Sequence, residues 1–129
     1  MINVRIVTPL GLYREMETSI LNLETLAGQL GILPNHMPLV SMLQVSHMST
    51  VENGERRTYA VAGGLLHFTD DKAVILTDAV ESQEEIDAAR AEEARARAKE
   101  RLSRQDGAID TKRAEAALKR AMNRLKLKE

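Results

Sequence analysis

The chain of 129 residues contains no cysteine and no tryptophan, and only one phenylalanine and two tyrosines. Without cysteine there is no disulfide bond, no thiolate ligand for a metal and no cysteine nucleophile. Because aromatic side chains are scarce, a hydrophobic core has to be built from Leu, Ile, Val and Met. The length suits one domain of ordinary size, or a small domain with an appendage.

Long apolar runs and a surplus of one charge are also missing. No apolar run approaches the ~20 residues that a membrane-spanning helix needs, and the first residues lack the pattern of a signal peptide. Lys and Arg number 18 against 19 Asp and Glu, which gives a formal net charge of -1. A dedicated nucleic-acid-binding protein usually shows a basic excess. We therefore expect a soluble intracellular protein that reaches a membrane only through a partner.

Motifs for catalysis and for metal binding are absent from the sequence. It has no G-x-x-x-x-G-K-[ST] phosphate loop, no G-x-S-x-G nucleophile elbow and no H-E-x-x-H zinc motif. His36, His47 and His67 are isolated, and their spacing does not suit a shared metal ion. We expect no catalytic residue and no metal site, so the chain is predicted not to be an enzyme by itself.

The composition changes near residues 80–83. Residues 1–80 hold all three Pro, all three aromatic residues and every Gly except Gly107. Residues 81–129 are rich in Ala, Glu, Arg and Lys, which favour helices. The sequence predicts a segregated α+β chain, with an all-β sandwich over residues 1–80 and an antiparallel two-helix hairpin over residues 81–129.

Strand signals fill the first part. Residues 2–6 alternate between apolar and polar, the pattern of a half-buried strand, and residues 73–77 form the short apolar run of a buried one. Asn53 and Gly54 stand between apolar alternations and predict a hairpin turn, because both residue types tolerate positive φ. Many short strands with frequent turns favour a sandwich or a barrel.

Two helices are expected in the second part. Ser82 and Glu85 fit a capping box, so the first helix is predicted over residues 83–104. Residues 105–107 form the predicted break, and Asp110 caps a second helix that ends near residue 125.

The apolar faces of these helices are narrow and consist mostly of alanine. They comprise Ile86, Ala89 or Arg90, Ala94, Ala98 and Leu102 on the first helix, and Ala114, Ala117 or Leu118, Ala121 or Met122, and Leu125 on the second. A buried Ala contributes only ~0.8 kcal/mol, whereas a buried Leu contributes ~1.5–3 kcal/mol. We therefore expect the hairpin to dock marginally on its sandwich and to be a movable element.

Two motifs carry a family resemblance. Residues 28–39 read GQLGILPNHMPL and residues 59–65 read YAVAGGL, after a start that contains Ile6-Val7-Thr8-Pro9. Together they resemble the epsilon subunit of bacterial F-type ATP synthase, whose mitochondrial counterpart is called delta. The resemblance covers the whole chain. Asn35 and Leu65 stand where that family frequently has Gly and Phe.

The resemblance implies a non-catalytic rotor subunit of the central stalk, peripheral on the cytoplasmic face of the bacterial cell membrane. In that family the sandwich binds the gamma subunit and sits on the c-ring, and so couples ion-driven rotation to ATP synthesis. The helices either fold against the sandwich or extend along gamma into the catalytic alpha/beta head, where they inhibit ATP hydrolysis. The residues implied at the c-ring and gamma contact are Gln29, Leu30, Gly31 and His36. Many relatives have an acidic residue in place of Gln29.

A second resemblance concerns nucleotide binding. Residues 86–91 read IDAARA, similar to the I/L-D-x-x-R-A motif of family members that bind ATP on the folded hairpin. The similarity implies that Ile86, Asp87, Arg90 and Ala91 contact the nucleotide. Glu81 stands at the position of another ligand in those relatives.

Helix geometry supports an anion site in the same place. Pairing the two helices about the predicted break puts Asp87 opposite Arg124 and Arg90 opposite the turn of Arg120. Arg97 follows Arg90 on the same face, about 10 Å along the helix. Guanidinium groups match phosphate oxygens in pairs. The alternative is that these charged residues bind no ligand and only form surface ion pairs, each of which contributes ~0–1 kcal/mol.

ATP is therefore predicted as a regulatory ligand that needs no Mg²⁺, and no cofactor is required. A nucleotide that bridges both helices at a hundred times its dissociation constant adds ~2.7 kcal/mol to the folded hairpin. High ATP would then hold the hairpin down and relieve inhibition.

Two other classes of function are open from the sequence alone. One is a stand-alone nucleotide-sensing binding module made of a sandwich and a helical hairpin. The other is an adaptor whose arginine-rich helices bind RNA or a coiled coil, although the helices lack aromatic residues for base stacking. Co-purification with a gamma subunit separates the rotor subunit from both.

Overall fold

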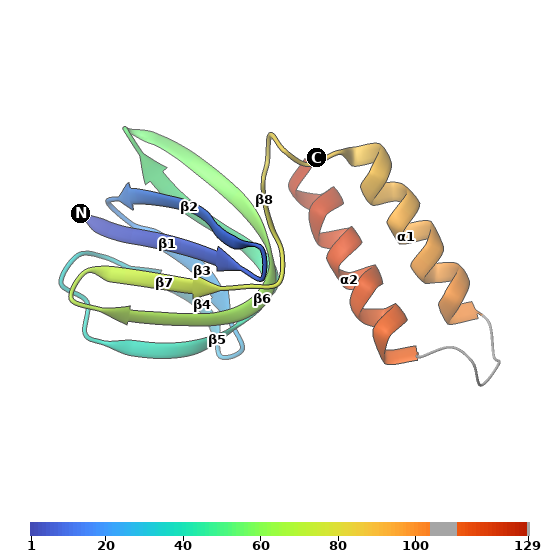
Figure 1. The fold of residues 1–129 in the computed structure, drawn as a ribbon, viewed down its shortest axis with the longest axis horizontal. Helices are drawn as coiled ribbons and strands as arrows, with labels where there is room; N and C mark the ends of the chain where they lie inside the picture. Colours follow the sequence, from blue (N-terminus) through green and yellow to red (C-terminus); the bar gives the residue numbers. More distant parts are fainter. Residues whose placement is uncertain (104–110, 129) are drawn as a thin grey trace.

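The computed structural model describes residues 1–103 and 111–128, in which strands are followed by two helices (Figure 1). The strands are β1 (Ile2–Thr8), β2 (Gly11–Thr18), β3 (Leu21–Thr25), β4 (Gly28–Ile32), β5 (Leu39–Glu52), β6 (Glu55–Thr69), β7 (Lys72–Leu76) and β8 (Val80–Ser82). The helices are α1 (Ala88–Ser103) and α2 (Thr111–Lys128). The predicted α+β order, with strands first and a helical hairpin last, is confirmed.

The strands pair in the order β2-β1-β7-β6-β5-β3-β4, and β8 also pairs with β6. The pair β1–β7 is parallel and the others are antiparallel. β5 and β6, with 14 and 15 residues, are long enough to bend and contribute to both layers of the sandwich. Their turn is the predicted one, because Asn53 and Gly54 have φ values of 53° and 79°.

The core lies between the two layers and is mainly aliphatic. Ile2, Val4 and Ile6 of β1 are completely buried, as their alternation predicts. Two of the three aromatic residues, Tyr59 and Phe68, join them. The sandwich is thus held together by burial of Leu, Ile, Val and Met side chains, at ~25 cal/mol per Å² of apolar surface.

β7 and β8 lie one after the other along β6. Leu65 pairs with Leu76 of β7, and Val61 pairs with Val80 of β8, in the same register. Between these pairs the chain passes over Gly64, where an added Cβ would lie 1.9 Å from the carbonyl oxygen of Leu76. The Gly-Gly sequence of β6 therefore allows the chain to pass from one layer to the other at close range.

The predicted start of the first helix is wrong. Glu85 does reach back to the backbone N–H of Ser82, as in a capping box, but Ser82 still pairs with Tyr59 as the last residue of β8. The cap of α1 is Asp87, whose Oδ1 accepts a hydrogen bond of 3.1 Å from the backbone N–H of Arg90. Strand pairing outweighs the local capping signal here. The predicted break at residues 105–107 and the cap Asp110 lie outside the described residues.

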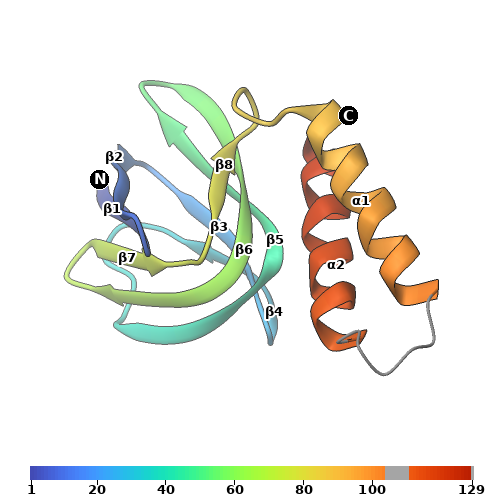
Figure 2. The same ribbon diagram turned by 45° about the vertical axis from the view of Figure 1, so that its right-hand side comes forward.

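α2 lies between the sandwich and α1 (Figure 2). The two helices meet through small residues: Ala91 and Ala98 of α1 are buried, as are Ala114 and Ala121 of α2. The predicted faces are confirmed at the last three of these. The predicted face of the first helix is wrong at its first turn, because Ala89 and Arg90 are exposed and Ala91 takes the buried position.

Candidate functional site

The hairpin docks on the sandwich through Asn123 of α2. Its side-chain Nδ2 donates to the backbone carbonyl oxygen of Ser46, and its backbone carbonyl oxygen lies 3.0 Å from Nε2 of His47. These contacts lie where β5 bulges away from β3: six residue steps separate Leu43 from Ser49, against three from Thr25 to Asn22 on β3. Within the bulge Ser46 is not paired with a residue of β3, so its backbone carbonyl is free to accept the hydrogen bond from the helix.

A second set of contacts ties the C-terminal end of α2 to the segment that leads into α1. Gln83 Nε2 donates to the carbonyl oxygen of Leu127 at 3.1 Å, and Lys128 Nζ donates to the carbonyl oxygen of Gln83 at 3.1 Å. Leu127 packs with Ala60 and Ile86 in a small apolar cluster separate from the main core. Among the described residues, docking therefore combines these polar bonds with a small cluster of three buried apolar side chains.

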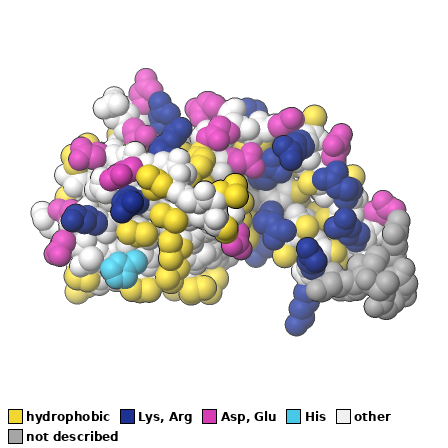
Figure 3. Space-filling view, viewed as in Figure 1, with side chains coloured by type: hydrophobic (Ala, Val, Ile, Leu, Met, Phe, Trp, Pro, Cys, Tyr) yellow, Lys and Arg dark blue, Asp and Glu magenta, His cyan; other side chains and the backbone are white. Residues whose placement is uncertain are grey.

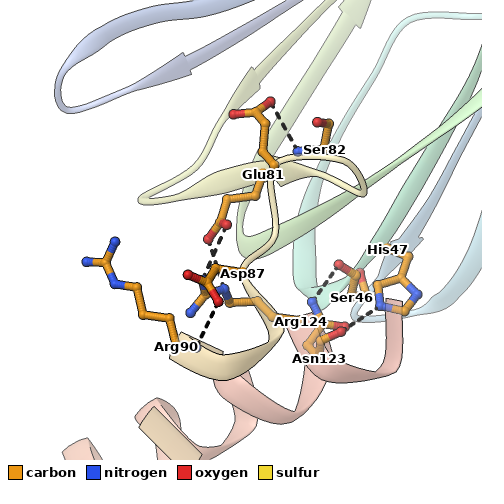
Figure 4. Close-up of polar contacts among 9 residues, drawn as sticks. Ser46, His47, Glu81, Ser82, Asp87, Arg90, Asn123 and Arg124 are labelled. Atoms are coloured by element: carbon orange, nitrogen blue, oxygen red, sulfur yellow. Dashed lines mark hydrogen bonds and ion pairs between the residues drawn. The ribbon is translucent and has the colours of Figure 1, made fainter. Parts of the chain in front are cut away.

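A pocket of about 310 Å³ lies at the open end of the hairpin, at the lower limit of the ~300–1,000 Å³ typical of small-molecule sites. The residues that line it are Glu81, Glu85, Asp87, Arg90, Ala94, Arg97 and Arg124. β8, the lead-in to α1, and both helices all contribute to it. Figure 4 shows Glu81, Asp87 and Arg124 close together, with the Arg90 guanidinium pointing away from them.

Glu81 and Arg124 form a two-pronged ion pair across this pocket. Arg124 Nε lies 2.8 Å from Oε1 of Glu81, and Arg124 Nη2 donates to Oε2 at 3.3 Å. The Arg124 side chain is 23% exposed and the Glu81 side chain 31% exposed, so the pair is partly shielded from water. It joins β8 to α2 and adds to the docking of the hairpin.

Five of the eight predicted nucleotide-binding residues come together in this pocket: Glu81, Asp87, Arg90, Arg97 and Arg124. The other three lie elsewhere. Ile86 is buried in the cluster with Leu127, and Ala91 is buried in the interface between the helices. Arg120 lines a small neighbouring pocket against Ala60 and Val61.

Sequence reasoning missed Glu85 and Ala94 as lining residues. Ala94 follows Arg90 by one helical turn and precedes Arg97 by three residues, so its position on the same face was available from the spacing. Glu85 precedes the helix, and its direction is set by tertiary contacts.

Glu85 is fixed by hydrogen bonds from the Tyr13 hydroxyl of β2 and from the backbone N–H of Ser82. Burial and the bond to Glu85 raise the pKa of Tyr13 to about 12. Burial opposes ionisation of Glu85, but the hydrogen bonds outweigh it and lower the pKa of this carboxyl. Tyr13 and Glu85 thus anchor the lead-in to α1 on the sandwich.

The predicted c-ring residues are split between two places. Gln29, Leu30 and Gly31 of β4 line a polar groove of about 670 Å³ together with His47 of β5 and Lys126 of α2. His36 lies outside this groove and packs edge-on against Phe68, with ring centroids 5.9 Å apart.

An apolar row crosses the outer face of the sandwich. Register pairs connect Leu12 to Val7, Val7 to Leu76, Leu76 to Leu65 and Leu65 to Met42, across β2, β1, β7, β6 and β5. Leu12, Leu76 and Met42 are 51%, 46% and 54% exposed. Figure 3 shows hydrophobic side chains over the sandwich in this view of the molecule, while Lys and Arg gather over the helices. Contiguous exposed apolar side chains of this kind mark interaction surfaces.

Within residues 1–103 and 111–128, no cluster of His, Asp and Glu is arranged to hold a metal ion. Over the same residues, neither helix combines the length and the hydropathy that a membrane span requires.

Residues 1–83 match the family described as ATP synthase, Delta/Epsilon chain, beta-sandwich domain, and residues 84–129 match its long alpha-helix domain. The chain belongs to the ATP synthase delta/epsilon family. It is 43% identical over 125 residues to the ATP synthase epsilon chain of Clostridium novyi (strain NT), covering 96% of this chain and 95% of that one. The epsilon chain of Caldicellulosiruptor bescii is 45% identical over 107 residues, covering 83% and 78%.

Solved structures share the fold of this family member. A chain in the cryo-EM structure of the Euglena gracilis mitochondrial ATP synthase, with OSCP, F1 and the c-ring, aligns with a TM-score of 0.79 at 22% identity. That alignment covers 95% of this chain and 78% of the other. The predicted resemblance is therefore confirmed, and the chain is an ATP synthase subunit of the epsilon type rather than a catalytic one.

Proposed function

We propose that the chain is a rotor subunit of the central stalk, peripheral on the cytoplasmic face of a bacterial membrane, which couples rotation to ATP synthesis and restrains ATP hydrolysis through its helices. Family membership over both regions of the chain supports this role. A solved relative from Tetrahymena thermophila, at 15% identity and a TM-score of 0.59, belongs to a central stalk and c-ring assembly. The family also favours a subunit over a stand-alone nucleotide sensor or an RNA-binding adaptor.

The limited docking of the hairpin is the observation that carries the regulatory part. α2 reaches the sandwich through Asn123, the Glu81–Arg124 pair and the small cluster around Leu127. Contacts on this scale contribute a few kcal/mol, so docked and extended hairpins are close in free energy. In the extended state the basic second helix meets the catalytic alpha/beta head.

ATP is the ligand proposed for the pocket at the open end of the hairpin. Arg90 and Arg97 line the pocket from α1 and Arg124 lines it from α2, so phosphates bound by all three, with the Arg90 guanidinium turned toward Arg124, bridge the two helices. Asp87 and the backbone near it are available to the base. Because the bound nucleotide requires both helices in place, it stabilises the docked hairpin and opposes inhibition, without Mg²⁺.

The sandwich provides the two partner surfaces. The exposed apolar row from Leu12 to Met42 is proposed to dock on gamma, because it is the kind of surface that a stable interface buries. The polar outer side of the β3–β4 pair, with Gln29 and Gly31, is proposed to face the c-ring. His36 would act by holding the loop after β4 against Phe68.

Deleting residues 84–129 from the subunit in the assembled synthase tests the inhibitory role. ATP hydrolysis is expected to rise while assembly with gamma is retained, since the sandwich is intact. Unchanged hydrolysis would refute inhibition by the helices.

Calorimetry of the full chain tests the nucleotide role. Arg90→Ala is expected to weaken ATP binding about tenfold, the loss of a charged hydrogen-bonding group. Arg101→Ala, an exposed arginine of α1 that does not line the pocket, is the matched control and should bind as the wild type does. Equal heats for Arg90→Ala and wild type would remove the site.

A further inference from the structure

The pocket at the open end of the hairpin contains as many carboxylates as guanidinium groups. Glu81, Glu85 and Asp87 stand against Arg90, Arg97 and Arg124. The negative charges of this pocket equal its positive charges in number, which is unexpected for a site that binds a polyanion. Each carboxylate repels the incoming phosphates.

Two of these carboxylates are occupied by groups other than arginine side chains. Glu85 accepts hydrogen bonds from the Tyr13 hydroxyl and the Ser82 backbone, and Asp87 accepts one from the Arg90 backbone as the cap of α1. These two roles are structural and remain in place when a ligand enters.

Glu81 differs from the other two, since both of its oxygens face Arg124: Oε2 accepts a hydrogen bond from Nη2, and Oε1 lies 2.8 Å from Nε as an ion-pair contact. A carboxylate presents a guanidinium with the same pair of oxygens that a phosphate presents. By contrast, the guanidinium groups of Arg90 and Arg97 have no partner among the residues that the structure describes.

We infer that Glu81 is a built-in competitor for phosphate: it occupies Arg124 in the empty pocket and has to be displaced when a nucleotide binds. This inference rests on the proposed nucleotide site and changes the predicted role of Glu81 from ligand to competitor. Arg90 and Arg97 receive the phosphates first, and Arg124 exchanges the carboxylate for them.

The exchange makes the site selective for highly charged phosphates. Every ligand has to break the Glu81–Arg124 ion pair, at the same cost in free energy. A triphosphate offsets this cost better than a monophosphate, because it offers more oxygens to the arginines. Ligand binding then replaces a β8–α2 link by an α1–α2 link, which changes how the hairpin is held without releasing it.

The test is calorimetry of the full chain with ATP, with inorganic tripolyphosphate and with adenosine. Glu81→Gln keeps an oxygen that can accept from Arg124 but removes the competing charge. It is expected to tighten ATP and tripolyphosphate about fivefold, the value of a partly exposed ion pair, and to leave adenosine unchanged. Glu85→Gln is the matched control: it removes the same charge from the same pocket without freeing an arginine, and should tighten phosphate binding less.

The outcomes separate this inference from the proposed function. If wild type binds ATP and Glu81→Gln binds it equally or more weakly, Glu81 is a ligand or a clamp and the inference is wrong while the nucleotide site stands. If wild type does not bind ATP but Glu81→Gln binds tripolyphosphate, competition is supported and the nucleotide role fails. Absence of binding by either protein overturns both.

Discussion

Gly64 of β6 has no room for a side chain. Its φ of 129° is unfavourable for other residues, and an added Cβ would lie 1.9 Å from the carbonyl oxygen of Leu76. We expect Gly64→Ala to lower the free energy of unfolding by about 3–5 kcal/mol, the sum of backbone strain and overpacking. Denaturant unfolding of the isolated chain measures this.

Gly28 provides the control, because its φ of 122° is similar but its added Cβ meets nothing within 4 Å. Gly28→Ala should therefore cost only the backbone strain, about 1–3 kcal/mol. Equal losses for both variants would show that the contact with Leu76 is irrelevant.

Tyr13 should make the fold sensitive to alkaline pH. Its pKa is about 12 in the folded chain because burial and the bond to Glu85 disfavour the phenolate, and near 10 when unfolded. The unfolded chain therefore loses the proton first, so this contribution to stability is complete below pH ~10 and is lost as pH rises to about 12. Tyr13→Phe should flatten the decline in unfolding free energy over that range, and an identical decline would contradict the assignment.

For the charged residues of the pocket, the sequence predicts which arginines come together but not which carboxylate pairs with them. The i,i+7 spacing of Arg90 and Arg97 was enough to place both in one pocket with Arg124. The partner of Arg124 is Glu81 rather than Asp87, because β8 brings Glu81 back alongside α2. That placement depends on strand pairing with Ala60, which no helical spacing reveals.

The α1–α2 interface depends on small side chains. Ala98 is 1% exposed between the helices, whereas Ala96 is exposed on the same helix. We expect Ala98→Leu to destabilise the hairpin by about 1–3 kcal/mol through overpacking. Thermal melting followed by circular dichroism should show a lower helix transition for Ala98→Leu than for the control Ala96→Leu, and equal melting would mean that the helices do not pack closely.

Asn123 should control the fraction of docked hairpin. Removing its 3.0 Å bond to the Ser46 carbonyl costs about 1 kcal/mol, or about fivefold in the docking equilibrium. NMR of the amides of Ser46 and Leu127 measures the docked fraction of Asn123→Ala. Glu115→Ala, at an exposed position of the same helix, should leave it unchanged, and no difference between the two variants would remove Asn123 as a docking contact.

Elements with strong periodicity were predicted, and their junction was not. The alternation of β1 and the Asn53-Gly54 turn gave correct strands, since each signal is local. The capping box at Ser82 was placed at a helix start because its sequence is right, yet pairing with Tyr59 keeps Ser82 in a strand. Whether Ser82 caps a helix or pairs in a strand depends on Tyr59, which is distant in sequence, so residues 82–85 alone do not decide it.

At the scale of the whole molecule, the apolar row should determine partner binding. Leu76 lies in the middle of the row and is 46% exposed. Leu76→Asp is expected to reduce co-purification with gamma at least tenfold, because it places a charge at the centre of an interface. Leu26→Asp, at an exposed leucine in the β3–β4 turn, should leave gamma binding intact. Retained binding by Leu76→Asp would assign gamma to another face.

The end-to-end arrangement of β7 and β8 on β6 has a mechanical consequence. Once the hairpin has left its docking contacts, a pull on the helices reaches the sandwich through β8, whose ladder with β6 comprises Val80, Glu81 and Ser82. Such a load would break the pairing of these three residues with β6 one residue at a time. It would then act on the segment at Leu76, where the backbone lies too close to Gly64 for a side chain. The connection between the sandwich and the helices can thus lengthen under tension by the length of β8 and no more, while the aliphatic core stays intact.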